Sequence, residues 1–184
     1  IDGLEKARAV LESFISEIEE YWDVAATRAP ASAIAVVRRI CDRLHVVART
    51  LRARHNNRAT IEIADEYDVQ DLLHALLRVE FDDVRPEETT PSYAGGSSRM
   101  DFLLKAERIV VEVKMARPGL DAKKVGEELI LDTAKYQSHP DCDQLFCFVY
   151  DPDSRIRNPR GLEADLSGKR DAIEVFVSVR PMEG

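Results

Sequence analysis

The hydrophobic positions of this chain fall into short runs with the period of strands and longer runs with the period of helices. Residues 99–104 and 109–114 are two short apolar runs separated by four polar residues, which predicts a β-hairpin. Residues 144–150 are typical of a buried strand, and residues 173–179 alternate as a final strand. Residues 84–93 form a weaker strand candidate, because prolines interrupt them.

Two longer runs have the spacing of amphipathic helices. Residues 65–80 place apolar side chains at i, i+3, i+4, i+7 and i+8 behind Asp65, a residue suited to the N-cap. Residues 122–138 form a second helical run, which opens after a Pro-Gly pair and ends before a proline. Residues 155–167 contain a proline, a glycine and mixed charges, so we expect a loop there.

The N-terminal part carries two heptad repeats. Apolar residues recur at heptad spacing over residues 4–25 and again over residues 34–51, on either side of a break that contains a proline. We therefore predict an antiparallel helical hairpin over residues 1–58, followed by a second domain over residues 59–184. The apolar stripe of these helices is wider than the contact between the two helices needs. We therefore expect the hairpin to pack on the second domain, or on a second copy of the chain to form a homodimer.

The hairpin register brings charged side chains together. If Leu104 pairs with Ile109, counting back along both strands places Asp101 directly opposite Glu112, with side chains about 5 Å apart. Lys114 lies two residues further along its strand and therefore shares their face of the sheet.

Two facing carboxylates inside an apolar run destabilise a sheet unless a cation compensates them. Mg²⁺ or Mn²⁺ would do so, because Mg²⁺ prefers one or two carboxylates together with waters and phosphate oxygens. Lys114 would then orient or help to deprotonate an attacking water and stabilise charge on a phosphate. The alternative is an edge hairpin with a surface acid–lysine pair. Asp121 and Lys123 have the same spacing as Glu112 and Lys114, but we expect them at the start of a helix rather than in a strand.

Asp101, ten intervening residues and then Glu-Xaa-Lys resemble the motif of the PD-(D/E)XK nucleases, the superfamily of restriction endonucleases and related repair and recombination nucleases. The resemblance covers about residues 62–151 and departs from the motif at Met100, where the superfamily name has proline. It implies an α/β fold with a restriction-endonuclease-like αβββαβ core and a mixed central sheet. It also implies Mg²⁺-dependent phosphodiester hydrolysis, with metal ligands at Asp101 and Glu112 and a catalytic Lys114.

The first helix of this core offers a third carboxylate. Glu66 falls on the same stripe as the apolar side chains of residues 65–80, so it points toward the core rather than toward water. In many members of the superfamily a glutamate of this helix completes the metal site, which makes Glu66 the candidate here and Asp68 or Gln70 the substitutes. The alternative is that Asp65, Glu66 and Asp68 only cap the helix.

Residues on and near the second helix complete the predicted site. Gln137 resembles a glutamine that several branches of the superfamily use to orient substrate or metal waters, whereas Tyr136 continues the apolar stripe and is a core residue by its pattern. Four basic residues near the motif are candidates for contacts with DNA phosphates, or else for a solvated surface: Arg99, Arg117, Lys123 and Lys124.

The amino-acid composition narrows the possible classes of protein further. The chain has 184 residues, 45% of them hydrophobic and 33% charged, which suits one core and an appendage. No apolar run approaches the roughly 18 to 20 residues of a membrane span, so we expect no membrane partner. Its three cysteines and four histidines lack metal-ligand spacing, which argues against zinc and favours free thiols in the cytoplasm. The first residue is Ile1 rather than Met, and we expect a processed or excised piece.

The net charge of −8 counts against a protein that coats nucleic acid through a broadly basic surface. A nuclease is compatible with it, because a metal and a few local cations can hold the scissile phosphate. Residues 31–58 nevertheless contain seven arginines and one acid, Asp42. A solvated or partner-facing helix is favoured there over contact with nucleic acid.

We therefore expect a metal-dependent endonuclease acting on DNA, with a restriction or anti-phage defence role and a larger defence-system partner suggested by the resemblance. One alternative is a catalytically silent module of this fold that serves assembly or nucleic-acid binding. Another is an unrelated α+β interaction domain. The intact set of Asp101, Glu112 and Lys114 favours the enzyme, because a silent copy has no physical reason to keep two facing carboxylates.

Overall fold

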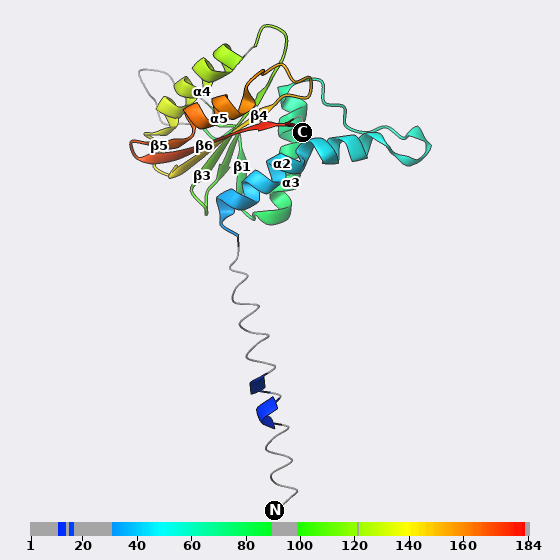
Figure 1. The fold of residues 1–184 in the computed structure, drawn as a ribbon, viewed down its shortest axis with the longest axis vertical. Coiled ribbons are helices and arrows are strands. Elements are labelled where there is room, and N and C mark those ends of the chain that lie inside the picture. The colour runs from blue at the N-terminus through cyan, green and yellow to red at the C-terminus, as the bar shows by residue number, and fades with distance from the viewer. Residues whose placement is uncertain (1–10, 14, 17–30, 90–98, 121, 183–184) are drawn as a thin grey trace, which may run out of the picture. The chain divides into compact units, whose positions relative to one another are not determined.

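The computed structural model describes residues 11–13, 15–16, 31–89, 99–120 and 122–182. The chain forms two compact units, residues 1–32 and residues 33–184. The second unit holds a six-stranded sheet and the helices that surround it (Figure 1). Within the described ranges, no helix is long and apolar enough to cross a membrane.

The sheet is mixed, with the strand order β1-β2-β3-β4-β6-β5. Strands β3, β4 and β6 run parallel to one another in its centre, and the remaining neighbours pair antiparallel. The strand bounds are β1 Val84–Pro86, β2 Phe102–Leu104, β3 Ile109–Met115, β4 Gln144–Tyr150, β5 Gly168–Arg170 and β6 Ile173–Arg180.

Helices cover both faces of this sheet (Figure 1). Successive strand residues point to opposite faces, so Val111 and Val113 of β3 pack with the helices of one side and Val110 with those of the other. The first side carries α2 (Ala33–Arg52) and α3 (Glu66–Glu80), and the second carries α4 (Ala122–Tyr136) and α5 (Pro159–Leu166).

Most of the predicted elements are confirmed. Leu104 pairs with Ile109 as expected, and β4 occupies the whole of the predicted range. The side chain of Asp65 accepts hydrogen bonds from the amides of Tyr67 and Asp68, so it is the N-cap of α3. The restriction-endonuclease-like α/β class with a mixed sheet is therefore confirmed. The strand predicted over residues 84–93 is shorter in the described part of the chain, where β1 spans Val84–Pro86.

The loop expected over residues 155–167 is wrong, because these residues contain α5. Asn158 caps this helix by accepting a hydrogen bond from the amide of Gly161, and Pro159 occupies its first turn. Proline is favoured at the first helical position, where its missing N–H costs nothing. The Asn-Pro pair was therefore a helix start rather than a loop.

Helix α2 packs inside the second unit. Its buried residues Val37, Cys41 and Leu44 join the core formed with α3 and the sheet. The unit therefore begins at Ala33 rather than at residue 59. The other helix of the expected hairpin falls mostly on residues outside the described ranges, so the hairpin and the homodimer stay predictions.

Candidate active site

Two of the three motif residues lie on the face of the sheet that packs on α4, and the third lies beside them. Phe102 pairs with Val111, and Asp101 immediately precedes Phe102, where β2 begins. Side chains alternate along a strand, and Val111 and Val113 point to the α2–α3 core. Glu112 and Lys114 therefore point to the opposite face, toward α4.

Strand β3 extends beyond its partner β2, and this extension positions two of the acids. Beyond Val111 the amides on the β2 side of β3 have no partner strand. The Asp101 carboxylate accepts a hydrogen bond from the Val113 amide at 2.7 Å, and the Glu66 carboxylate accepts one from the Met115 amide at 3.0 Å. These amides are two residues apart, about 7 Å along a strand. The expectation that Glu66 points inward is therefore confirmed by its contact with β3.

Glu112 is the most deeply buried acid of the site. Its side chain accepts hydrogen bonds from the Lys114 ammonium and from the Tyr136 hydroxyl, each at 2.7 Å. Burial, followed by the charge of Asp101, raises the pKa of Glu112 to about 8. Burial also raises the pKa of Asp101 to about 6, although the Val113 amide opposes this shift. Raised pKa values on neighbouring carboxylates mean that this site disfavours having both acids ionised without a further cation.

Asp132 of α4 provides Lys114 with a second acidic neighbour. The carboxylate of Asp132 lies 3.2 Å from the Lys114 ammonium and 2.8 Å from the Lys135 ammonium. Burial lowers the pKa of Lys114, but the charges of Glu112 and Asp132 raise it more, so the net pKa lies well above its ordinary value. Lys114 is therefore a cation at neutral pH. The ammonium donates to Glu112 and lies near Asp132, so at least one of its three N–H groups remains for a water or a phosphate.

Asp132 and Tyr136 were missed by sequence reasoning as members of this site. Tyr136 is buried, as its pattern predicted, but its hydroxyl donates to Glu112. The sequence could have indicated Asp132. This acid lies on the same helical stripe as the buried residues Val125, Leu129 and Tyr136. The same argument identified Glu66 on α3.

The substitutes considered for Glu66 do not reach the motif by any contact seen among the described residues. The Asp68 carboxylate accepts hydrogen bonds from the amides of Ala64 and Asp65, so it closes the capping box of α3. Gln70 is half-buried on the same helix. Capping therefore accounts for Asp68 but leaves Glu66 to the site.

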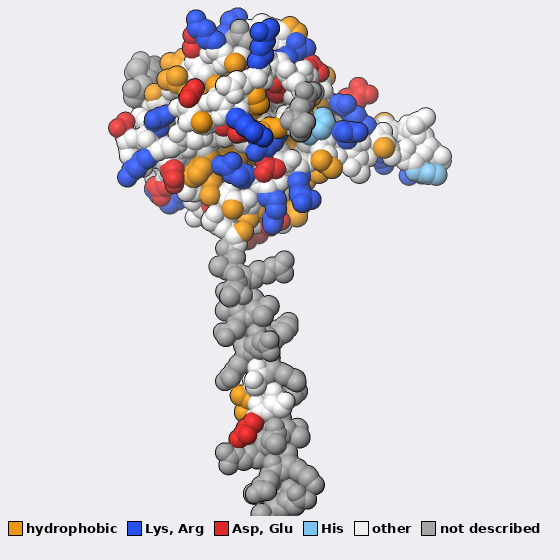
Figure 2. Space-filling view, viewed as in Figure 1, with side chains coloured by type: hydrophobic (Ala, Val, Ile, Leu, Met, Phe, Trp, Pro, Cys, Tyr) orange, Lys and Arg blue, Asp and Glu red, His pale blue; other side chains and the backbone are white. Residues whose placement is uncertain are grey.

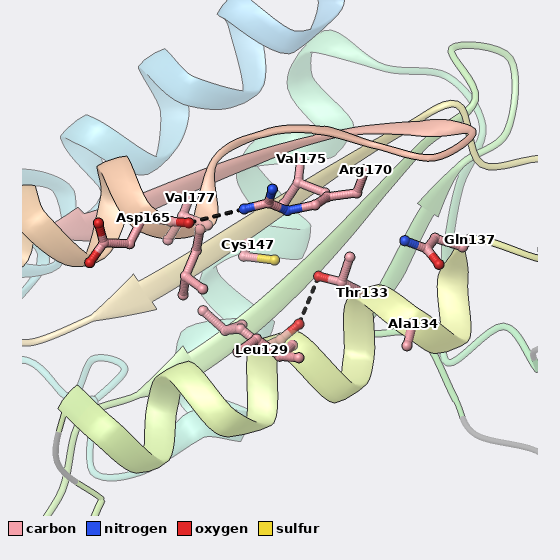
Figure 3. A pocket seen from close by; sticks show the side chains of 11 residues that line it. Leu129, Thr133, Ala134, Gln137, Cys147, Asp165, Arg170, Val175 and Val177 are labelled. Atoms are coloured by element: carbon pink, nitrogen blue, oxygen red, sulfur yellow. Dashed lines mark hydrogen bonds between the residues drawn. The ribbon is translucent and has the colours of Figure 1, made fainter.

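Gln137 lies just beyond the end of α4, beside an apolar cavity of about 370 Å³ (Figure 3). Leu129 and Thr133 of α4, Cys147 of β4 and Val175 of β6 also line this cavity. Among the described residues, no contact joins Gln137 to the three motif side chains. Its catalytic role stays a prediction.

Two of the four basic candidates, Arg99 and Arg117, lie close to the motif. Arg99 is close through a contact with Tyr136, and Arg117 is close in the sequence. The Tyr136 hydroxyl approaches the carbonyl oxygen of Arg99 at 3.4 Å, and Arg117 follows the end of β3 by two residues. Lys123 is exposed in the first turn of α4, 3.8 Å from Glu127. Lys124 donates to the carbonyl of Gly119 at 2.7 Å. Their contacts with DNA stay predictions.

The donor set fits a hard divalent cation. Within the described residues, no group of three or more His, Cys, Asp or Glu side chains could hold a metal ion. Mg²⁺ does not need such a group, because it commonly keeps several waters and binds through one or two carboxylates and substrate phosphates. Asp101 and Glu112 offer those carboxylates, whereas Glu66 as a third ligand stays a prediction.

A mixed sheet with helices on both faces, and an acid pair beside a lysine on its central strands, define a restriction-endonuclease-like protein. The chain belongs to the DpnII-MboI family of restriction endonucleases, whose family model matches residues 35–182. Membership of this family indicates a nuclease that cleaves DNA. The comparisons found no match among curated proteins and none among solved structures.

Proposed function

We propose that the protein is a Mg²⁺- or Mn²⁺-dependent PD-(D/E)XK endonuclease that hydrolyses phosphodiester bonds of DNA in restriction or anti-phage defence. Asp101 and Glu112 would hold the metal. When bound, the ion supplies a Lewis acid that neutralises charge on the phosphate and lowers the pKa of a bound water. The observation that supports the proposal is the cluster around Glu112, to which Lys114 donates at 2.7 Å and whose pKa is raised by burial and by the charge of Asp101.

The energetics of this cluster support a site built for an added cation. Glu112 is 4% exposed and lies beside Asp101, and both pKa values are raised. Keeping two such acids costs stability in the absence of a counter-charge, and Lys114 is already shared with Asp132. A divalent ion would offset this cost, which gives a physical reason for the arrangement.

Lys114 acts as a fixed positive charge in this proposal rather than as a base. Because its pKa is raised by Glu112 and Asp132, the amine stays protonated and cannot accept a proton from water at neutral pH. Its remaining N–H can instead hold the attacking water or a phosphate oxygen. A preorganised donor of this kind contributes to catalysis where charge develops in the transition state.

The test is a cleavage assay on duplex DNA of mixed sequence with Mg²⁺ or Mn²⁺. Lys114→Ala leaves both proposed metal ligands in place, and we expect it to reduce the cleavage rate by about 10² or more. Lys169→Ala is the matched control, because Lys169 is exposed on β5, is not among the candidate DNA contacts, and its substitution removes the same charge. We expect the control to cleave at a rate close to that of the wild type.

Equal rates for the wild type and Lys114→Ala would refute the role of this lysine. Absence of cleavage by the wild type on duplex DNA, single-stranded DNA and RNA would refute the enzyme and favour the catalytically silent module.

A further inference from the structure

A basic arm joins α2 to α3. We define the arm as residues 52–62, which leave the end of α2, turn at a short 3₁₀ helix, His55–Asn57, and return to α3. Figure 1 shows this cyan segment projecting away from the sheet, and Figure 2 shows blue and pale-blue side chains along it. Residues 52–59 are all exposed. The arm is therefore a surface element without a role in the core over most of its length.

The charge of the arm contrasts with that of the whole chain. The chain carries a net charge of −8, yet residues 43–61 contain five arginines and no acid. Three of these arginines are on the arm itself: Arg52, Arg54 and Arg58. Glu62, where the arm returns to α3, is its single acid. Such a concentration of one sign attracts a polyanion rather than a neutral partner.

The arginines of the arm have no acidic partner in the described part of the chain. Elsewhere in the same unit, Arg39 pairs with Glu80 and Arg180 pairs with Asp42. No described carboxylate comes within ion-pair distance of Arg52, Arg54 or Arg58. Their guanidinium groups are therefore available to an external anion, and guanidinium donors match phosphate oxygens in geometry.

The tip of the arm forms a turn with hydrogen bonds of its own. Asn56 and Asn57 adopt left-handed φ values of 56° and 50°, a region that asparagine tolerates better than most residues. The Asn57 amide donates to the carbonyl of Arg54, and the Arg54 guanidinium donates to the carbonyl of Ala59. A preorganised turn of this kind loses less conformational entropy when it binds.

One end of the arm leads to the candidate active site. Its return limb enters α3 at Glu66, whose carboxylate contacts β3 at the Met115 amide. The other end leaves α2, whose His45, seven residues before Arg52, lies 2.8 Å from the hydroxyl of Tyr150, the residue paired with Met115 across β3 and β4. Both helices that carry the arm therefore contact the end of β3 and β4 at which the motif ends.

The length of the arm suits a nucleic-acid duplex. Arg58 is eight residues before Glu66, so it lies at most about 28 Å away along the chain. One turn of a DNA duplex is about 34 Å long. A duplex held at the candidate site would therefore place phosphates within reach of the arm less than one turn from the cleaved bond.

We propose that the arm binds the phosphate backbone of duplex DNA beside the scissile phosphate, through Arg52, Arg54 and Arg58. This inference rests on the proposed nuclease function and adds to it the surface that holds the substrate. The contact is electrostatic, so it strengthens binding to every sequence and depends on salt.

The test measures binding of a mixed-sequence 30-base-pair duplex over a series of salt concentrations. Ca²⁺ replaces Mg²⁺, and recovery of intact duplex verifies that no cleavage has occurred. The test variant is Arg52→Ala with Arg58→Ala, because neither side chain makes a hydrogen bond within the described residues. We expect the slope of log K against log salt to fall in magnitude by about 1.8, and affinity near 0.1 M salt to fall by about tenfold or more.

Two controls isolate the arm. Arg78→Ala with Lys169→Ala removes the same charge from exposed positions on α3 and β5, and we expect the wild-type slope. Arg52→Lys with Arg58→Lys keeps the charge, and we expect most of the slope to return. Circular dichroism verifies the fold of each variant.

The outcomes separate this inference from the proposed function. A wild type that binds and cleaves DNA, with an unchanged slope in the arm variant, would overturn the role of the arm alone. An equal loss of slope in the Arg78 and Lys169 control would also overturn it. A wild type that neither binds nor cleaves DNA would overturn both proposals.

Discussion

Glu112→Gln should stabilise the metal-free protein at neutral and higher pH. The Glu112 side chain is buried, and burial together with the charge of Asp101 raises its pKa to about 8 from an ordinary value of 4.5. In the unfolded chain this carboxyl ionises first as the pH rises. The folded state therefore loses stability between about pH 4.5 and pH 8, and the whole penalty is present above pH 8. Glutamine has a similar shape and never ionises.

The size of the effect follows from the same values. Each pH unit above 4.5 costs about 1.4 kcal/mol until the folded-state pKa is reached. At pH 7 the penalty would be about 3 kcal/mol, reduced by any relaxation of the site around the charge. Glutamine keeps one acceptor for Lys114, and the Tyr136 hydroxyl can rotate to accept from its amide.

The assay is urea denaturation in EDTA at several pH values between 5 and 8.5. We expect the free energies of unfolding of the two proteins to differ little at pH 5 and to diverge by about 2 to 3 kcal/mol at pH 7 to 8, with the variant more stable. Titrating groups distant from the cluster are common to both proteins, so the difference reports Glu112 together with its effect on Asp101 and Lys114. A variant that is less stable than the wild type at pH 8 would refute the reasoning.

Two further predictions concern the same cluster. Millimolar Mg²⁺ or Mn²⁺ should raise the melting temperature of the wild type by mass action, and Asp101→Asn should lose most of that response; a wild type indifferent to the metal would argue against a functional site. Tyr136→Phe removes the hydroxyl that donates to Glu112 at 2.7 Å, so the Mg²⁺ concentration for half-maximal cleavage should rise by about tenfold. The rate at saturating Mg²⁺ should change much less, whereas loss of rate with unchanged Mg²⁺ dependence would contradict a role through Glu112.

Local periodicity was sufficient to predict the central elements of the site. The register of the hairpin follows from two strands separated by a short polar turn, and Leu104 does pair with Ile109. Because side chains alternate along a strand, the pattern also determines that Glu112 and Lys114 share a face, and the register brings Asp101 to the same end of the hairpin. Glu66 was identified in the same way, from its place on a helical stripe. These inferences need only neighbours in the sequence.

Local pattern could not predict contacts between elements that are distant in the sequence. Asp132 and Tyr136 meet Lys114 and Glu112 only because α4 packs across β3, and that packing depends on the order of the strands and the path of the connections. Gln137 adjoins Tyr136 in sequence but lies beside the apolar cavity, whose walls come from α4, β4 and β6 and are not visible in the local pattern.

The sequence by itself therefore determined which residues share a face, because that depends on the fixed periods of strands and helices. The tertiary structure alone decided what each face meets. The basic arm shows the difference: its arginines are visible in the sequence, whereas its connection to the end of β3, through the contact of Glu66 with the Met115 amide, results from the packing of α3 on the sheet. Burial in that packed structure also raises the pKa values of Asp101 and Glu112, because desolvation depends on every neighbour at once.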